Sequence, residues 1–450
     1  MKKSLLWIVV LLLSITMVAM VSLVGCKEEA PAEEEVAEVE EEVVEEEVAE
    51  VEEEVAAEPI TIVFGSRPNE PQPAWDNVLA AFQEDNPNIT LDIQQCPDDS
   101  TFYTKWAAGE RPDITIFAMN SQWYLQLRPT ETMVDLSDQP FIQRILYDSV
   151  LDAGTIDGKV YAMGYRYPFF FGAFYNKDIF AQLNLTIPTN YVEFFELCET
   201  IKAAGITPLF AGGADKFPLV NIPMVMWTDY VKKDKIHELL NANQIDWTDI
   251  RIVQGIQKQK DLLDAGFYNE DVLTAGWADA QTAIMEGTAA MFVDNSYPIG
   301  PLVEKYGIDA VNSKIGFFVL SEKDGVCDTI VSCGLWVPKT GNADKEAAAK
   351  KFLDWFSSSS GYQDYVNAIN EPPVFSGFET PTLPQAIVDG GNAMAENSAP
   401  NIDSLIAASY GDFPTFCSEL AAGQKTPLEV AQSLDDTFTA NAVEMGLPGF

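Results

Sequence analysis

The chain contains little histidine and few basic residues. It has a single histidine, His237, among 450 residues. A Ser-His-Asp triad or a His-rich metal site needs imidazoles in a defined arrangement, so the count argues against both. Lys and Arg number 27 against 69 Asp and Glu, and the formal net charge is −42. Nucleic acids and anionic lipid surfaces would repel such a chain, so we expect neither as a partner.

Cysteine is also scarce, and no CxxC motif occurs among the six. Beyond Cys26 an odd number remains, which argues against a complete disulfide framework. If Cys327 and Cys333 shared one strand they would lie about 20 Å apart, so they could bond only across a turn. We expect buried, unpaired thiols without a metal or cofactor. These cysteines are Cys96, Cys198, Cys327, Cys333 and Cys417.

The N-terminus has the pattern of a secretory signal over residues 1–25. Lys2 and Lys3 precede an apolar run that ends in Leu23-Val24-Gly25-Cys26. This tetrapeptide resembles the lipobox of bacterial lipoproteins, which implies lipidation of Cys26 and a new N-terminus there. The alternative is a retained transmembrane anchor, because the run is nearly long enough to span a bilayer. Either way, we expect an extracytoplasmic protein, and the lipobox favours anchoring to a bacterial membrane by lipid at Cys26.

Residues 26–58 are low in complexity and strongly acidic. Seventeen Glu alternate with Val and Ala, and only Lys27 offsets them. The valine spacing of three to five imitates a heptad, but mutual repulsion of the glutamates favours a disordered tether over a coiled coil. The signal carries +2 and the tether −16 of the formal charge, which leaves −28 for residues 59–450.

The residues after the tether have the alternation of an α/β protein. A buried strand at 60–64 is followed by a helical stripe through Trp75 and Phe82, and further strands are expected at 89–94 and 113–118. Short connections between alternating strands and helices predict a parallel, doubly wound sheet. Ligands bind such sheets beyond the carboxyl ends of their strands.

A second lobe is expected further along the chain. Asn190 and Glu193 have capping-box spacing at the start of a helix. Another helix ends at Gly287, before a strand of small and apolar residues at 289–293. Asp344 is expected to cap an alanine-rich helix that carries Phe352. About 390 residues suit two lobes better than one.

Four segments, in order, resemble the family 1 extracellular solute-binding proteins of ABC importers, whose ligands are sugars. The second of them is the most specific. They are Arg111-Pro112-Asp113-Ile114; Ile156 to Gly164 with Phe174-Tyr175-Asn176-Lys177-Asp178; Met285 to Phe292; and Gly334 to Lys339 with Ala349 to Leu353.

The resemblance implies a two-lobed, type II periplasmic-binding-protein-like α/β fold. Each lobe would be a sheet flanked by helices, and a hinge of two or three crossing strands would join the lobes. We expect residues 59–165 and 322–358 in the N-terminal lobe, and 166–321 and 359–450 in the C-terminal lobe. The implied protein is a monomer that is not an enzyme. It would bind a carbohydrate and deliver it to the permease subunits of an ABC transporter.

Candidate ligand contacts follow from the strand ends and the family pattern. Sugars need planar polar groups at their edges and rings against their faces. Tyr297 stands where family members often carry a stacking Trp, and Asn120 where they place a polar side chain. The full set consists of Arg67, Asn120, Tyr165, Arg166, Phe169, Asp294, Asn295 and Tyr297.

Several alternatives stay open at this point. The aromatic run around Pro168 also fits a core, and Arg67 or Arg166 could be paired inside this acidic chain. If the arginines are free, they favour an acidic ligand such as a uronate. A secreted glycoside hydrolase would use paired carboxylates, which coincide easily among so many Asp and Glu. A surface adhesin or scaffold is the remaining alternative.

Overall fold

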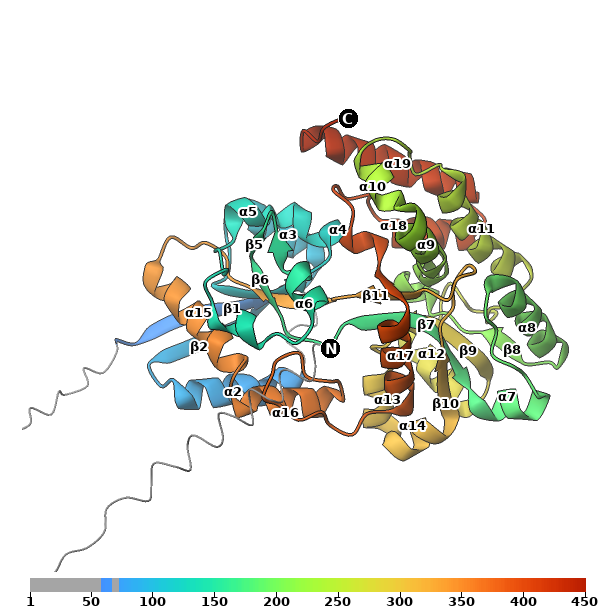
Figure 1. The fold of residues 1–450 in the computed structure, drawn as a ribbon, viewed down its shortest axis with the longest axis horizontal. Coiled ribbons are helices and arrows are strands. Elements are labelled where there is room, and N and C mark those ends of the chain that lie inside the picture. The colour runs from blue at the N-terminus through green and yellow to red at the C-terminus, as the bar shows by residue number, and fades with distance from the viewer. Residues whose placement is uncertain (1–57, 67–72) are drawn as a thin grey trace, which may run out of the picture. The chain divides into compact units, whose positions relative to one another are not determined.

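The computed structural model describes residues 58–66 and 73–450. These residues form two β-sheets flanked by helices (Figure 1). These residues belong to one compact unit, Ala56–Phe450. The predicted signal, Cys26, most of the tether and Arg67 lie outside the described residues. In the described part, no helix combines the length and apolarity needed to cross a membrane. The two sheets confirm the predicted two-lobed α/β fold.

The N-terminal lobe contains a mixed sheet in the order β2-β1-β3-β12-β6. The first three strands are parallel, as the alternation of strands and helices predicts, with Ile60 opposite Ile89 and Phe64 opposite Ile114. Strand β12 runs antiparallel to both of its neighbours, β3 and β6. The strands are β1 (Ile60–Ser66), β2 (Ile89–Gln95), β3 (Ile114–Ala118), β12 (Cys333–Trp336) and β6 (Ala162–Gly164), and a separate hairpin joins β4 (Thr155–Ile156) to β5 (Lys159–Val160).

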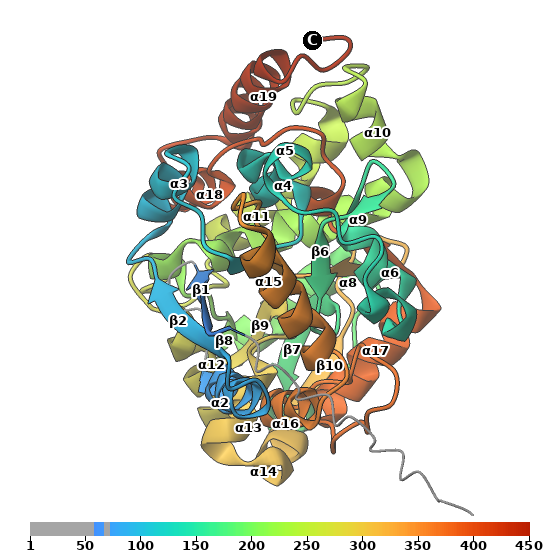
Figure 2. The same cartoon turned by 90° about the vertical axis from the view of Figure 1, so that its left-hand side faces the viewer.

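Helices cover this sheet, and α15 lies across it in Figure 2. The predicted stripe of α2 is buried through Val78, Leu79 and Phe82. Asn342 caps α15, two residues before the expected Asp344, because the Asn342 side chain accepts the first free backbone N–H groups. The helices are η1 (Pro73–Trp75), α2 (Asp76–Asp85), α3 (Asp99–Ala107), α4 (Ser121–Tyr124), η2 (Leu125–Leu127), α5 (Pro129–Thr132), η3 (Pro140–Arg144), α6 (Asp148–Ala153), α15 (Ala343–Phe356) and α16 (Ser360–Ile369).

The C-terminal lobe contains a sheet in the order β13-β11-β7-β9-β8, with β10 also paired to β7. Its central strand β7 runs antiparallel to β9, with Gly172 opposite Asp294. Strand β8 runs parallel to β9, so their carboxyl ends meet at one edge. The strands are β7 (Phe169–Asn176), β8 (Thr207–Leu209), β9 (Ala289–Asn295), β10 (Ile315–Phe318), β11 (Cys327–Ile330) and β13 (Ser398–Pro400).

Local sequence signals set several helix ends in this lobe. The Asn190 side chain caps α8 by accepting from the backbone of Glu193. Gly287, with φ of 76°, ends α12 in the left-handed conformation that favours glycine. The helices are α7 (Lys177–Leu183), α8 (Tyr191–Ala203), η4 (Gly213–Asp215), η5 (Phe217–Val220), α9 (Asn221–Asp234), α10 (Ile236–Asn241), α11 (Ile250–Asp264), α12 (Trp277–Glu286), α13 (Ile299–Tyr306), α14 (Ile308–Lys314), α17 (Gln385–Glu396), η6 (Ile402–Ser404), α18 (Phe413–Ala421) and α19 (Pro427–Glu444).

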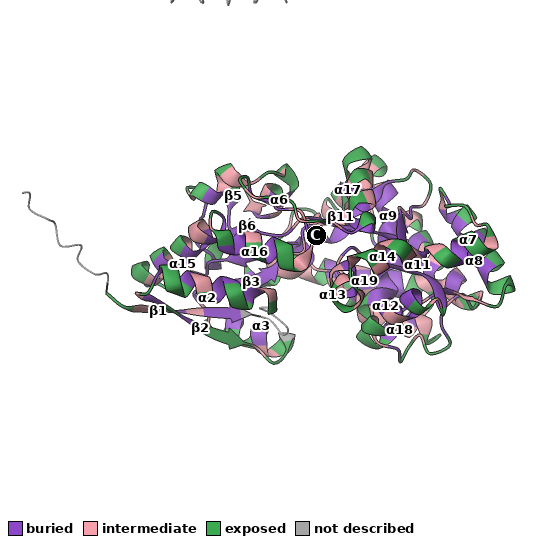
Figure 3. Ribbon diagram, turned by 90° about the horizontal axis from the view of Figure 1, so that it is seen from below, coloured by how far each residue is buried: buried purple, intermediate pink, exposed green. Residues whose placement is uncertain are grey.

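Three segments cross between the lobes: 165–168, 331–332 and 380–384; residues 370–379, after α16, still pack on the N-terminal core. The buried residues form separate groups on the two sides of these crossings (Figure 3). The lobe boundaries differ from the expected ones in two places. Strand β11, expected in the N-terminal lobe, pairs with β7 of the C-terminal sheet.

The second difference concerns α16, which was expected in the C-terminal lobe. It belongs to the N-terminal core because Tyr362 and Tyr365 pack against Phe356, and Tyr365 also packs against Trp75. Among the described residues, the five cysteines form no disulfide with one another. Cys198, Cys327 and Cys417 are buried, whereas Cys96 and Cys333 are half-buried.

Candidate functional site

An aromatic corner lies on the C-terminal lobe where β9 ends. The rings of Trp277 and Tyr297 are 5.6 Å apart between centroids, and Phe169 is 6.0 Å from Tyr297. Phe217 is 39% exposed beside them. These rings border a cavity of about 440 Å³. Its lining consists of Phe169, Asp215, Phe217, Pro218, Trp277, Ala278, Asp294, Asn295 and Tyr297.

Tyr297 is held at this corner by the turn that follows β9. The Asn295 side-chain oxygen accepts a hydrogen bond from the Tyr297 backbone N–H at 2.8 Å. This Asx-type turn is a common way for asparagine to end a strand. Helix α13 then begins at Ile299, two residues after Tyr297. The turn and the helix start together fix the backbone on both sides of Tyr297.

Trp277 is positioned at both its backbone and its indole. It opens α12, and its backbone N–H donates to Asp215 Oδ2 at 2.6 Å. The indole Nε1 donates to Asp294 Oδ2 at 2.7 Å. A buried carboxylate with a charge-assisted hydrogen bond holds its partner more firmly than a neutral acceptor would. The ring face is thus set by a residue of β9.

Asp294 has an unusual electrostatic position. Its side chain is 3% exposed, and its second oxygen accepts from the Asn295 backbone N–H at 2.7 Å. Burial raises the pKa of Asp294 to about 6, although the bonds from Trp277 and Asn295 favour the ionised form. Asp294 is therefore a supporting residue of the corner, with both oxygens engaged.

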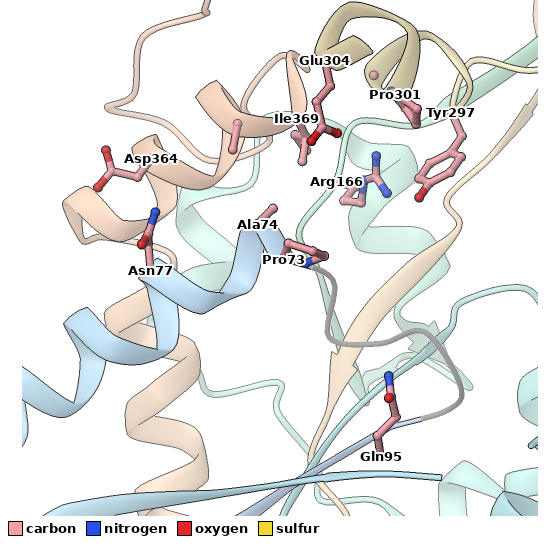
Figure 4. A pocket seen from close by; sticks show the side chains of 12 residues that line it. Pro73, Ala74, Asn77, Gln95, Arg166, Tyr297, Pro301, Glu304, Asp364 and Ile369 are labelled. Atoms are coloured by element: carbon pink, nitrogen blue, oxygen red, sulfur yellow. The ribbon is translucent and has the colours of Figure 1, made fainter. Parts of the chain in front are cut away.

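A second cavity, of about 640 Å³, lies between the lobes and shares Tyr297 with the first (Figure 4). The N-terminal lobe contributes mainly small and amide side chains to it, whereas Tyr297, Pro301 and Glu304 come from the C-terminal lobe. The lining consists of Pro73, Ala74, Asn77, Gln95, Arg166, Tyr297, Gly300, Pro301, Glu304, Asp364, Ala368 and Ile369.

Arg166, a predicted ligand contact, is paired inside the protein. Its Nε lies 3.1 Å from Glu371 Oε2, and a second bond joins Nη2 to Oε1. The side chains are 8% and 11% exposed. Burial raises the pKa of Glu371, and the neighbouring guanidinium partly offsets this. The sequence left open whether Arg166 is free to bind a ligand or paired inside the protein. In the structure it forms an internal salt bridge with Glu371.

Two other predicted contacts are placed away from the aromatic corner. Tyr165 is 1% exposed, packs edge-to-face on Trp75, and has its hydroxyl 3.1 Å from Cys333 Sγ. Tyr165 is therefore part of the N-terminal core. Asn120 is 5% exposed at the start of α4, and its Oδ1 is buried without a donor among the described residues.

Asn120 lies beside a direct contact between the lobes. The Ser121 hydroxyl donates to the Asp403 backbone carbonyl at 2.9 Å, and Gln122 Nε2 donates to the Gly411 carbonyl at 2.8 Å. Asn120 is not among the residues that line the two cavities described above, and its role as a ligand contact stays a prediction. Phe169, Asp294, Asn295 and Tyr297 do come together as expected.

Three residues of the corner were missed by sequence reasoning. Asp215 and Phe217 follow β8, whose carboxyl end lies beside that of β9, and Trp277 begins the helix before β9. The rule that ligands bind beyond strand ends could have included the loop after β8. It could not have indicated Trp277, because that residue begins the helix before β9 and is held at the corner by its tertiary bonds to Asp215 and Asp294.

No group of three His, Cys, Asp or Glu side chains is arranged to hold a metal ion in the part of the chain that the structure describes. The polar groups of the corner are carboxylates, amides and an indole, most of them bonded to one another. Combined with ring faces, such a set can orient an uncharged polar molecule by stacking and hydrogen bonding.

Known proteins with similar sequences belong to a family of solute-binding proteins. The family model described as bacterial extracellular solute-binding protein matches residues 77–389. A multiple sugar-binding protein of Streptococcus mutans is 21% identical over 324 residues, which are 71% of this chain and 76% of that relative.

Two solved structures show the same fold. A chitin oligosaccharide binding protein superposes with a TM-score of 0.74 at 20% identity, over 86% of this chain and 99% of its own. The solute-binding protein RafE in complex with raffinose gives 0.70 at 21% identity, over 85% and 99%. The family match covers well over half of the sequence and confirms the predicted family. The chain belongs to the bacterial extracellular solute-binding proteins.

Proposed function

We propose that this protein captures a sugar or oligosaccharide between its lobes and delivers it to the permease of an ABC transporter. The observation that carries the proposal is the aromatic corner of Phe169, Phe217, Trp277 and Tyr297 around one cavity. Sugars present C–H faces that pack on aromatic rings, and hydroxyls that need planar polar partners. The names of related proteins, which bind multiple sugars, chitin oligosaccharides and raffinose, support the same class of ligand.

The size of the site favours more than one sugar ring. The cavity at the corner measures about 440 Å³, and the interlobe cavity that shares Tyr297 adds about 640 Å³. One ring would rest on Trp277 and Tyr297, and the next would reach Asn77 and Gln95 on the other lobe. A ligand that contacts both lobes stabilises the closed form by its differential contacts.

The charges around the two cavities favour a neutral ligand over a uronate. Arg166 is the cation among the described lining residues, and Glu371 already neutralises it. The exposed charged groups of the lining are Asp215, Glu304 and Asp364. An acidic sugar would meet like charges, which disfavour binding by several kcal/mol when juxtaposed.

A thermal-shift screen followed by isothermal titration calorimetry tests the proposal. The panel contains raffinose, stachyose, N-acetylchitooligosaccharides, xylooligosaccharides, galactose and an oligouronate. A ligand present at 100 times its dissociation constant adds about 2.7 kcal/mol to the free energy of unfolding. We expect a neutral oligosaccharide to raise the melting temperature. Absence of saturable binding across the panel would favour an adhesin or scaffold instead.

The same panel separates binding from hydrolysis. We propose that the protein is not an enzyme, because the buried carboxyl of Asp294 is engaged by Trp277 and the backbone. Prolonged incubation with each oligosaccharide, followed by chromatography, should return the sugar intact. Release of shorter sugars would indicate a glycoside hydrolase.

We also propose that the protein is extracytoplasmic, that lipid at Cys26 anchors it to a bacterial membrane, and that it works there as a monomer. The lipobox-like Leu23-Val24-Gly25-Cys26 supports this proposal. Cys26→Ala should yield an unprocessed or released precursor, whereas Ser4→Ala serves as the control. If the Cys26 variant is processed and extracted with membranes like the wild type, the lipoprotein proposal is wrong.

A further inference from the structure

Arg166 joins one of the segments that cross between the lobes to the N-terminal lobe. It lies on the crossing 165–168, and Glu371 lies just after α16, in the segment 370–379 that packs on the N-terminal core. Both residues are at least nine-tenths buried, and two hydrogen bonds link their planar groups. Such bidentate pairing fixes the plane of a guanidinium as well as its position.

A second contact ties the crossing 165–168 to the segment after α16 independently of this ion pair. The Tyr362 hydroxyl donates to the Tyr165 backbone carbonyl at 3.0 Å and accepts from the Val374 backbone N–H at 2.8 Å. Tyr165 precedes Arg166 directly, and Val374 lies three residues after Glu371. The backbone around the ion pair is therefore held even without the charges.

The guanidinium of Arg166 also faces the aromatic corner. Its central carbon is 4.7 Å from the ring centroid of Phe169 and 5.3 Å from that of Tyr297. Figure 4 shows Arg166 and Tyr297 together at one end of the interlobe cavity. A cation within about 6 Å of a ring face is attracted by the ring, and more strongly when both are shielded from water.

We propose that Arg166 is a positioning residue of the sugar site, whose guanidinium holds the ring of Tyr297 in the orientation that stacks on the ligand. Glu371 keeps the guanidinium in the required plane, and the ring of Phe169 makes a second contact with the same guanidinium. Arg166 then acts on the sugar through Tyr297 rather than by its own charge. The inference rests on the proposed sugar-binding function of this corner.

A double-mutant cycle tests this role. Removing Arg166 alone would leave Glu371 buried and unpaired, which commonly costs 3–5 kcal/mol, so both residues are replaced together. Arg166→Met with Glu371→Leu removes the cation while keeping similar volume, and apolar replacements of buried ion pairs are often neutral for stability. The exchange is made in the wild type and in a Tyr297→Leu background, and affinity for the best oligosaccharide of the panel is measured.

We expect the exchange to lower affinity about five- to thirtyfold when Tyr297 is present. In the Tyr297→Leu background it should change affinity by less than about twofold, because no ring is left to position. Equal losses in both backgrounds, or no loss in either, would overturn the proposal. The matched control exchanges the remote N-terminal pair, with Arg144→Met and Asp354→Leu, and should leave affinity unchanged.

A charge-swapped pair gives a second measurement, and it decides the matter if the apolar pair does not fold. Arg166→Glu with Glu371→Arg keeps the ion pair but places a carboxylate beside the ring of Tyr297. We expect the swap to recover the melting temperature lost in each single variant but not the affinity. Recovery of both would show that only the hinge ion pair matters, and would contradict a positioning role.

Failure of the positioning role of Arg166 can be distinguished from failure of the proposed sugar-binding function. If the wild type binds no sugar of the panel, the proposed function fails and Arg166 is not at issue. If the wild type binds and the cycle shows no coupling between Arg166 and Tyr297, only the positioning role is wrong.

Discussion

The two lobes line their shared cavity with different chemistry. On the N-terminal side the large rings, Trp75 and Tyr165, are turned into the core, and Asn77 and Gln95 face the cavity. On the C-terminal side Tyr297 stays half-buried at the wall of this cavity, and Trp277 stays half-buried at the wall of the adjoining cavity that shares Tyr297. An aromatic residue near a cleft is therefore not by itself evidence of a ligand contact.

The difference suggests a division of tasks during capture. A ring platform offers apolar area without needing an exact hydroxyl pattern, so the C-terminal lobe can hold the sugar first. The amides of the N-terminal lobe add directional hydrogen bonds when the lobes close. Stability and affinity should therefore respond differently to substitutions in the two lobes.

The largest effect is expected from Trp75→Ala. Trp75 is fully buried among Phe64, Tyr165, Phe352 and Phe356, so the substitution should cost about 3–5 kcal/mol in the free energy of unfolding. Denaturant unfolding measures this loss. Affinity at a temperature where the variant remains folded should be close to that of the wild type. A large loss of affinity there would mean that the N-terminal ring also serves the ligand.

The next effect concerns Asp294 and pH. In the native state the Asp294 carboxyl has a pKa of about 6, whereas in the unfolded chain its pKa is about 4. Stability should therefore fall as pH rises from about 4 to about 6, by roughly 2–3 kcal/mol. Asp294→Asn removes this part of the pH dependence while leaving an acceptor for Trp277.

Asp403 provides the matched control for the pH experiment. Burial raises the pKa of Asp403 to about 7. The contribution of Asp403 to stability should therefore be lost as pH rises from about 4 to about 7. Asp403→Asn should therefore flatten the pH dependence between about 6 and 7 and leave the contribution of Asp294 in place. Identical unfolding profiles for wild type and both variants would contradict these assignments.

In the C-terminal lobe, Trp277→Ala should act on affinity. Loss of the stacking face is expected to weaken sugar binding by about 1–3 kcal/mol, or ten- to hundredfold. Stability should also fall, by about 1–3 kcal/mol, because Asp294 loses its indole donor. Trp277→Phe keeps a ring but not the donor, so calorimetry should show most of the affinity retained. Equal affinity for Trp277→Ala and wild type would remove Trp277 from the site.

The smallest effects belong to the amides of the N-terminal lobe. Asn77→Ala and Gln95→Ala should each weaken binding by about 0.5–1.5 kcal/mol, since each removes one exposed hydrogen-bonding group. Unfolding should be nearly unchanged because both side chains are exposed. If either variant loses as much affinity as Trp277→Ala, the N-terminal lobe carries the main contacts and the division of tasks is wrong.

Much of the fold could be predicted from local patterns. The spacing of apolar residues located β1, α2, β2 and β3, and Gly287 marked the end of α12 before β9. Resemblance to known solute-binding proteins supplied the lobes. The position of α16 could not be predicted, since Tyr362 and Tyr365 would be apolar anchors in either lobe and only tertiary packing selects one.

The site was less accessible to sequence reasoning. Asp294, Asn295 and Tyr297 are adjacent in sequence, so one strand end brings all three to the corner. Arg166 and Glu371 are 205 positions apart, and their pairing depends on how α16 and the residues after it pack in the N-terminal lobe. Trp277 likewise depends on a tertiary bond.

The central claim is that the Trp277–Tyr297 corner of the C-terminal lobe binds the sugar. Isothermal titration calorimetry of Tyr297→Ala with the best oligosaccharide of the panel tests it most directly, with Tyr306→Ala at the other end of α13 as the control. We predict that Tyr297→Ala lowers the affinity ten- to hundredfold, which corresponds to about 1–3 kcal/mol of binding free energy, and that the control leaves the affinity unchanged. Affinity for Tyr297→Ala equal to that of the wild type would contradict it.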